Sequence, residues 1–137
     1  MLKTLVIRLS LVLCILIFTT QVTAQEKKNY AYLSLEPDIV TNYLGSSATT
    51  LGYVRVSVEL MIDDVSNLEV AEHHLPLLRS TAIDIFGRQT EDRVKSLTGR
   101  EDIRRSILQA MRDHMKRETG SGAIIKDVIF TKYLYQG

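Results

Sequence analysis

The chain has 137 residues, of which 45% are hydrophobic and 24% are charged, so a disordered or low-complexity protein is excluded. Seventeen basic residues against sixteen acidic ones give a net charge of +1, which leaves no positive excess to neutralise the phosphates of a nucleic acid. Cys14 is the single cysteine, so disulfide scaffolds and cysteine-based zinc sites are excluded as well. The composition therefore predicts one globular domain that does not bind nucleic acid.

Residues 1–24 have the layout of a bacterial export signal. Lys3 and Arg8 precede a short apolar run, and the small residues at 22–24 close the segment. The chain is accordingly divided into residues 1–24, a signal peptide or signal anchor; residues 25–29, a short linker; and residues 30–137, an exported domain.

The apolar run is close to the length of a membrane span. The residues expected in the membrane are Leu5, Leu9, Leu11, Leu13, Ile15, Ile17 and Phe18. A stable span needs about 20 apolar residues, whereas residues 5–20 number sixteen and include Arg8. A cleaved signal peptide and an uncleaved anchor in the inner membrane therefore both remain open.

Alternating residues predict strands at the start of the exported domain. Two short strands are expected over residues 30–35 and 39–44, with Pro37 between them. The strongest signal lies over residues 53–62, where one face carries only aliphatic residues: Val54, Val56, Val58, Leu60 and Ile62. Strict alternation over this length predicts an antiparallel sheet with one buried face and one solvated face.

Helical spacing follows this strand. Ser66 with Glu69 has the form of a capping box, and Pro76 predicts an interruption or restart of the helix. A second capping box, Thr98 with Glu101, predicts the start of the clearest helix, whose apolar residues recur every four positions: Ile103, Ile107, Met111 and Met115. Its basic residues are interleaved with acidic ones, which favours a solvated, salt-paired face.

The closing strand, predicted over residues 124–135, is apolar on both faces. Simple alternation places Val128, Phe130 and Leu134 on one face and Ile129, Thr131, Tyr133 and Tyr135 on the other. The favoured interpretation is that the helix over residues 101–118 covers the second face. The alternative is that Tyr133 and Tyr135 lie at a subunit or partner interface, because tyrosine buries its ring while its hydroxyl stays hydrated.

Strands on either side of a block of helices predict the fold class. We expect an α+β fold, in which helices pack on one face of an antiparallel sheet, preceded by an N-terminal hydrophobic helix.

Signals for chemistry are few. Glu69, His73 and His74 form the one cluster with metal-ligand character, but zinc requires three or four ligands, and solvated histidines are the favoured interpretation. No nucleophile elbow of the G-x-S-x-G type is present, and the exported part has no cysteine. The sequence therefore predicts no catalytic residue, cofactor, metal or small-molecule substrate. A small exported enzyme or metal-binding protein that uses these three residues is the alternative.

Five segments, in order, resemble the FliL family of flagellar basal-body-associated proteins: YLSLEPDIVTNYL, YVRVSVELMI, HLPLLRSTAIDIF, LTGREDIRRSILQAM and VIFTKYLYQ. The residues that carry the resemblance are Leu35 and Pro37 with Asn42; Pro76 with Arg79; Thr98, Gly99 and Arg100 with Leu108; and Val128, Phe130, Thr131 and Gln136.

The resemblance implies a single-pass inner-membrane protein whose periplasmic domain is stomatin-like. It further implies a non-enzymatic, homo-oligomeric scaffold that associates with the stator proteins MotA/MotB and supports flagellar rotation, swarming and chemotaxis. The sequence departs from the family pattern in its short N-terminal tail and in the linker of residues 25–29, so a released periplasmic form is the alternative topology.

Overall fold

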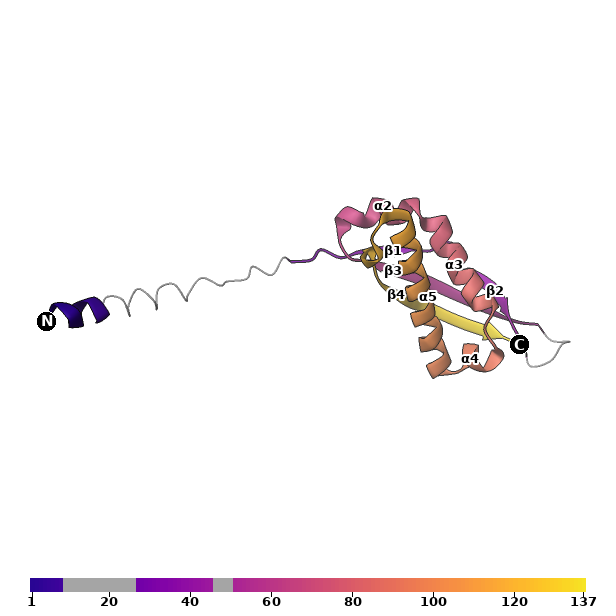
Figure 1. The fold of residues 1–137 in the computed structure, drawn as a ribbon. Coiled ribbons are helices and arrows are strands. Elements are labelled where there is room, and N and C mark those ends of the chain that lie inside the picture. Colours follow the sequence, from indigo (N-terminus) through magenta and orange to yellow (C-terminus); the bar gives the residue numbers. More distant parts are fainter. Residues whose placement is uncertain (9–26, 46–50) are drawn as a thin grey trace.

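The computed structural model describes residues 1–8, 27–45 and 51–137. The strands are β1 (Ala31–Ser34), β2 (Ile39–Tyr43), β3 (Gly52–Ile62) and β4 (Ile125–Gln136). The helices are α2 (Leu68–His73), α3 (Leu75–Gly87), α4 (Glu91–Lys95) and α5 (Leu97–Thr119), with 3-10 turns η1 (Val65–Asn67) and η2 (Gly122–Ile124). The helices lie on one face of an antiparallel sheet, as Figure 1 shows, so the predicted α+β class is confirmed.

The N-terminal segment is described only at its beginning. Residues 2–8 are helical, and Leu5 lies in this turn. The other predicted membrane residues lie outside the described ranges: Leu9, Leu11, Leu13, Ile15, Ile17 and Phe18. Among the residues that are described, no helix has the length and apolarity needed to cross a bilayer.

Strand β3 is the centre of the sheet. Leu60 pairs with Leu33 of β1 on one edge and with Val128 of β4 on the other. Val56 pairs with Ile39 of β2 on the same edge of β3 as β1. On the other edge, Val56 pairs with β4. Strands β1 and β2 therefore lie end to end along one edge of β3, and β4 alone covers the other. The chain enters at the β1 end and finishes at the opposite end of the sheet (Figure 1).

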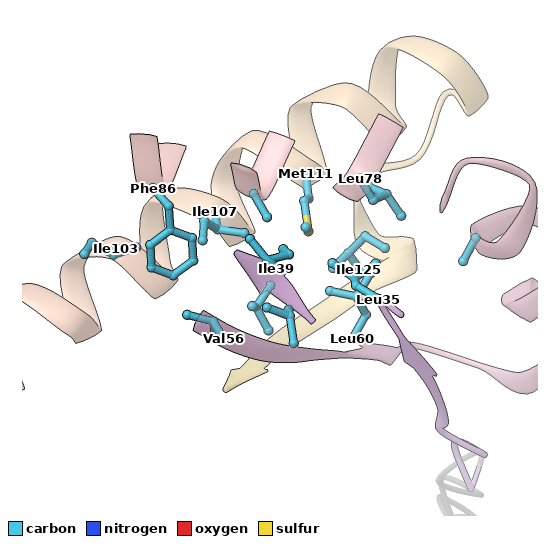
Figure 2. Close-up of a cluster of buried hydrophobic side chains, with 14 of the residues drawn as sticks. Leu35, Ile39, Val56, Leu60, Leu78, Phe86, Ile103, Ile107, Met111 and Ile125 are labelled. Carbon is cyan, nitrogen blue, oxygen red and sulfur yellow. The ribbon is translucent and has the colours of Figure 1, made fainter. Parts of the chain in front are cut away.

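The core lies between β3 and the two long helices. All five aliphatic residues of the alternating face of β3 are buried, as predicted. Figure 2 shows α5 above the sheet with Ile103, Ile107 and Met111 directed toward it, beside Leu78 and Phe86 of α3. Burial of one such side chain contributes about 1.5–3 kcal/mol, so this layer supplies the main stabilising term.

Asp64, rather than Ser66, caps the first helical turn. The Asp64 carboxylate accepts a hydrogen bond from the Ser66 backbone N–H at 2.9 Å, and α2 begins only after η1, without a side-chain cap. The predicted capping box of Ser66 with Glu69 is therefore wrong. The restart at Pro76 is confirmed, because this proline occupies the first turn of α3, where a missing N–H costs nothing.

Helix α5 also begins two residues earlier than the capping box predicted. The Ser96 hydroxyl oxygen accepts a hydrogen bond from the Gly99 backbone N–H at 3.0 Å, so Ser96 is the N-cap and Thr98 lies inside the helix. The helix ends where Gly120 adopts a φ of 85°, a left-handed conformation that glycine tolerates best.

Gly99 is the point at which α4 and α5 come closest. A Cβ at this position would lie 2.1 Å from the backbone oxygen of Arg93, and the obstructing atoms belong to the main chain. The sharp connection between the two helices therefore requires glycine here.

We expect Gly99→Ala to reduce the free energy of unfolding by about 1–3 kcal/mol, because the backbone of α4 must move to admit the methyl group. Gly87→Ala is the matched control, since a Cβ at that helical position meets its nearest atoms at 3.9 Å. Urea denaturation followed by circular dichroism measures both variants. Equal stabilities for the two would show that α4 does not constrain α5.

Candidate functional site

Tyr133 and Tyr135 lie on the helix side of the sheet. In the pairing of β3 with β4, Tyr133 is opposite Val56 and Tyr135 is opposite Val54. Both valines are fully buried beneath the helices. The two tyrosines therefore extend the core face of the sheet toward its C-terminal end.

A β-bulge in β4 sets this orientation. Phe130 and Lys132 pair with consecutive residues of β3, so Thr131 is an extra residue without a partner in the pairing. The extra residue reverses the alternation, and Phe130 and Tyr133 come to the same face. The prediction that they lie on opposite faces is therefore wrong, and nothing in the sequence marks the bulge.

Tyr133 is half-buried and held by neighbours within the domain. Its hydroxyl donates a hydrogen bond to the backbone oxygen of Val94 at 2.8 Å, and the Arg100 guanidinium lies 4.1 Å from its ring centroid. Phe86 and Phe130 contact the same ring at centroid distances of 6.2 and 5.7 Å. Burial raises the pKa of Tyr133 to about 12. Residues 101–118 were expected to cover this face of β4. Tyr133 is instead covered by α4 and by the first turn of α5.

Tyr135 is more accessible, with 45% of its surface exposed. The Lys95 ammonium lies 5.7 Å from its ring centroid and also donates hydrogen bonds to Glu91 at 2.5 Å and to the Gly137 backbone oxygen at 2.6 Å. On the opposite face, Leu134 is 56% exposed. The end of β4 therefore presents accessible apolar surface on both faces, beside a chain terminus that α4 holds in place.

Arg79 joins the helical layer to the break between β1 and β2. Its guanidinium donates hydrogen bonds to the backbone oxygens of Leu35 at 2.9 Å and Asp38 at 3.2 Å, and to that of Pro37. These residues come from two of the segments that resemble the FliL family. A guanidinium carries five donors in a fixed plane, so one side chain satisfies three carbonyls that lie at the interruption of the strands.

Asp38 continues this connection on the solvated face of the sheet. Its carboxylate accepts hydrogen bonds from Ser57 at 2.6 Å and Arg55 at 2.8 Å, and the Lys132 ammonium lies 4.0 Å away. The Ser57 hydroxyl and then the Arg55 guanidinium hold the pKa of Asp38 below its usual value. Sequence reasoning did not single out Asp38, because its partners belong to strands that are distant in the sequence.

Two arginines of α5 attach this helix to β4. Arg104 forms ion pairs with Glu101 and with Asp127, and Arg112 donates hydrogen bonds to the backbone oxygens of Ile125 at 2.9 Å and Lys126 at 2.7 Å. The hydrogen bond from Arg104, ahead of other contributions, lowers the pKa of Glu101 to about 2. A solvated, salt-paired face was predicted here, and the pairing with Glu101 confirms it, whereas the contacts with β4 were not foreseen.

Glu69, His73 and His74, the alternative metal site of the sequence analysis, are not arranged as a ligand set in the part of the chain that the structure describes. Glu69 and His73 are exposed on α2, while His74 follows the helix and its Nδ1 lies 2.8 Å from the Val70 backbone oxygen. The rings of His73 and His74 are 5.2 Å apart and edge-on. Within residues 1–8, 27–45 and 51–137, no group of three or more histidine, cysteine, aspartate or glutamate side chains is placed to hold a metal ion.

Comparison with known proteins places this geometry in a family. The family model described as "Flagellar basal body-associated protein FliL" matches residues 32–136. The chain belongs to the FliL family. A curated relative, "Flagellar protein FliL" of Aquifex aeolicus (strain VF5), is 24% identical over 102 residues. That alignment covers 74% of this chain and 59% of the relative, so the chain matches little more than half of that protein's length.

Some of the residues that carried the FliL resemblance connect elements within the domain. Arg79, Leu35 and Pro37 meet at the strand break, and Gly99 permits the close approach of α4 and α5. Thr131 is the bulged residue of β4.

Replacing Arg79 with Met should reduce the free energy of unfolding by about 1–3 kcal/mol, because three backbone carbonyls lose a charged donor. Arg88→Met is the matched control: Arg88 forms an exposed ion pair with Asp84 near the end of the same helix, and such pairs contribute about 0–1 kcal/mol. Urea denaturation compares them. If both variants lost the same stability, the joint at the strand break would be unimportant.

The lowered pKa of Glu101 predicts a pH dependence of stability. The folded-state pKa of about 2 lies below the ordinary value of 4.5, so the contribution of this carboxylate is complete above pH 4.5 and is lost as the pH falls through 2. We expect Glu101→Gln to lower the melting temperature at neutral pH, and the difference from the parent protein to shrink through this window. Glu118→Gln on the same helix is the control, and a similar pH profile for it would contradict the assignment to Arg104.

Proposed function

We propose that this FliL-family chain is a non-enzymatic scaffold that supports the function of flagellar stator units, MotA/MotB, at the basal body. The observation that carries the proposal is the family match over residues 32–136. The role of the matched residues inside the domain supports it, because a scaffold needs a rigid frame that presents surfaces. Rotation, swarming and chemotaxis are the processes that such a scaffold would serve.

The proposed topology is a single pass through the inner membrane with the domain in the periplasm. Support comes from the sequence of the N-terminal segment, in which Lys3 and Arg8 favour a cytoplasmic start and an apolar run follows. Cleavage after residue 24 would instead release a periplasmic protein. N-terminal sequencing of the mature chain distinguishes the two forms, since only the anchored form keeps Met1.

We further propose that Tyr135, with Tyr133 beside it, contributes to a contact with the stator or with a second copy of the chain. Tyr135 and Leu134 give the end of β4 an accessible apolar surface on each face. Aromatic residues that combine an apolar ring with a polar edge are frequent anchors of interfaces. Tyr133 lies beside this surface and is held in place by its contacts with Val94 and Arg100.

Deletion of the gene should reduce swimming speed under load and swarming, because stators that lack their scaffold would generate less torque. A fluorescently tagged copy should localise at motors in the presence of stators and disperse when they are absent. The proposal would be refuted if the deletion strain showed unchanged motility, or if the tagged copy localised independently of motors and stators.

Separate variants distinguish the interface from the core at the end of β4. We expect Tyr135→Ser to weaken motor localisation while the melting temperature stays nearly constant, because this ring is largely accessible. Tyr133→Phe should reduce the free energy of unfolding by about 0.5–1.5 kcal/mol through loss of the hydrogen bond to Val94, with localisation retained. Normal localisation of Tyr135→Ser would remove Tyr135 from the interface.

A further inference from the structure

The length of the linker restricts how far the domain can lie from a membrane. The apolar run ends at Phe18, and the Asn29 backbone oxygen already accepts a hydrogen bond from Val65 at 2.8 Å. The eleven peptide units between Phe18 and Asn29 extend over at most about 40 Å. If the apolar run is anchored as proposed above, the end of the domain beside Asn29 is the tethered end and lies within this distance of the bilayer.

A basic groove lies at this same end of the domain. It has a volume of about 430 Å³ and is lined by residues of the incoming chain, α5, η2 and the start of β4. Its charged lining consists of Lys28, Arg112, Lys116 and Lys126 against Asp63 and Asp113, an excess of two positive charges. The groove therefore lies at the tethered end of the domain, because Lys28 of the incoming chain is part of its lining.

The charges of the groove are only partly used within the domain. Asp63 accepts a hydrogen bond from Asn67 at 2.9 Å, and Asp113 accepts one from Gln109 at 3.0 Å. Lys116 and Lys126, in contrast, form no ion pair with any residue that the structure describes.

The position of Lys116 in the last turn of α5 is favourable on its own, since a cation stabilises a helix C-terminus. That reason does not extend to Lys126 on β4 or to Lys28 before β1. Their convergence on one groove requires another explanation.

Other grooves of the domain have a different charge. The groove between α5 and β4 balances Arg100 and Arg104 with Glu101 and Asp127. A third groove, at the break between β1 and β2, is lined by three acidic residues and no basic one: Glu36, Asp38 and Glu59. Of these three grooves, the one at the end where the linker enters is the one with an excess of positive charge.

We propose that the groove formed by Lys28, Arg112, Lys116 and Lys126 binds the phosphate headgroups of anionic phospholipids and holds the domain end-on against the membrane. Lysine side chains close to an anionic lipid surface are attracted to it, and salt weakens the attraction. Strand β4 then points away from the bilayer, which places Tyr135 about 30 Å farther out than Lys126. The lipid contact would therefore set the height at which the far end of the domain meets a partner.

The absence of tryptophan from the chain allows a direct test. Ala123→Trp introduces a single fluorophore at an exposed position of the groove lining, and Leu97→Trp introduces one at an exposed position at the start of α5. The full chain carrying either substitution is reconstituted into vesicles that contain a dansyl-labelled lipid, and energy transfer from tryptophan to dansyl is measured. The vesicles consist of phosphatidylglycerol or of phosphatidylcholine.

The expected result is strong transfer from the Ala123→Trp chain in phosphatidylglycerol and weaker transfer in phosphatidylcholine or in high salt. Lys116→Gln with Lys126→Gln should abolish the preference for phosphatidylglycerol, whereas Arg88→Gln with Arg105→Gln, which removes equal charge from exposed positions elsewhere, should leave it intact. The Leu97→Trp chain should show weak transfer in both lipids.

Equal transfer from both tryptophan positions, or indifference to the lysine substitutions, would overturn the proposal. Loss of the signal on addition of millimolar inorganic phosphate at constant ionic strength would assign the groove to free phosphate and overturn it too. Flotation of the full chain with vesicles reports on anchoring, and swimming reports on the scaffold function. A failure of the proposed anchoring or of the proposed scaffold function is therefore distinguishable from a failure of the lipid contact.

Discussion

The apolar face of β3 is the constraint on which the rest of the domain depends. Its buried side chains alternate without exception along the strand, and neighbouring strands on both edges extend the same face. A sheet of this kind gains stability only if one layer of helices excludes water from that face. The four-residue apolar repeat of α5 packs on this face, and buried residues of α3 pack beside it (Figure 2).

Arginine side chains connect the helices to the sheet. They donate hydrogen bonds to backbone oxygens that strand pairing leaves without a donor. Arg79 reaches from α3 to the carbonyls at the break between β1 and β2, while Arg104 and Arg112 reach from α5 to those of β4. Backbone oxygens at such places need a donor once water is excluded. Because a guanidinium is charged at all physiological pH values and offers several donors, it can hold a strand and a helix in fixed register.

This construction leaves the two ends of the sheet for external contacts. Several residues that resemble the FliL family connect elements within the domain, among them Arg79 and Gly99. One end receives the incoming chain and carries a basic groove, and the other presents Tyr135 and Leu134 beside the C-terminus. The two ends of the sheet therefore differ in charge and in exposed apolar surface.

Periodicity in the sequence determined the α+β class and the core faces of β3 and α5, because each depends on local spacing. The tertiary structure alone decided the placement of β1 and β2 on one edge, the bulge at Thr131 and the partners of Asp38. Each of these depends on which distant backbone groups pair. A bulge inserts one residue into a strand without changing the composition of that strand, so only the pairing partner reveals it. The orientation of Tyr133 followed from that pairing, and with it the division of the closing strand into core and accessible surface.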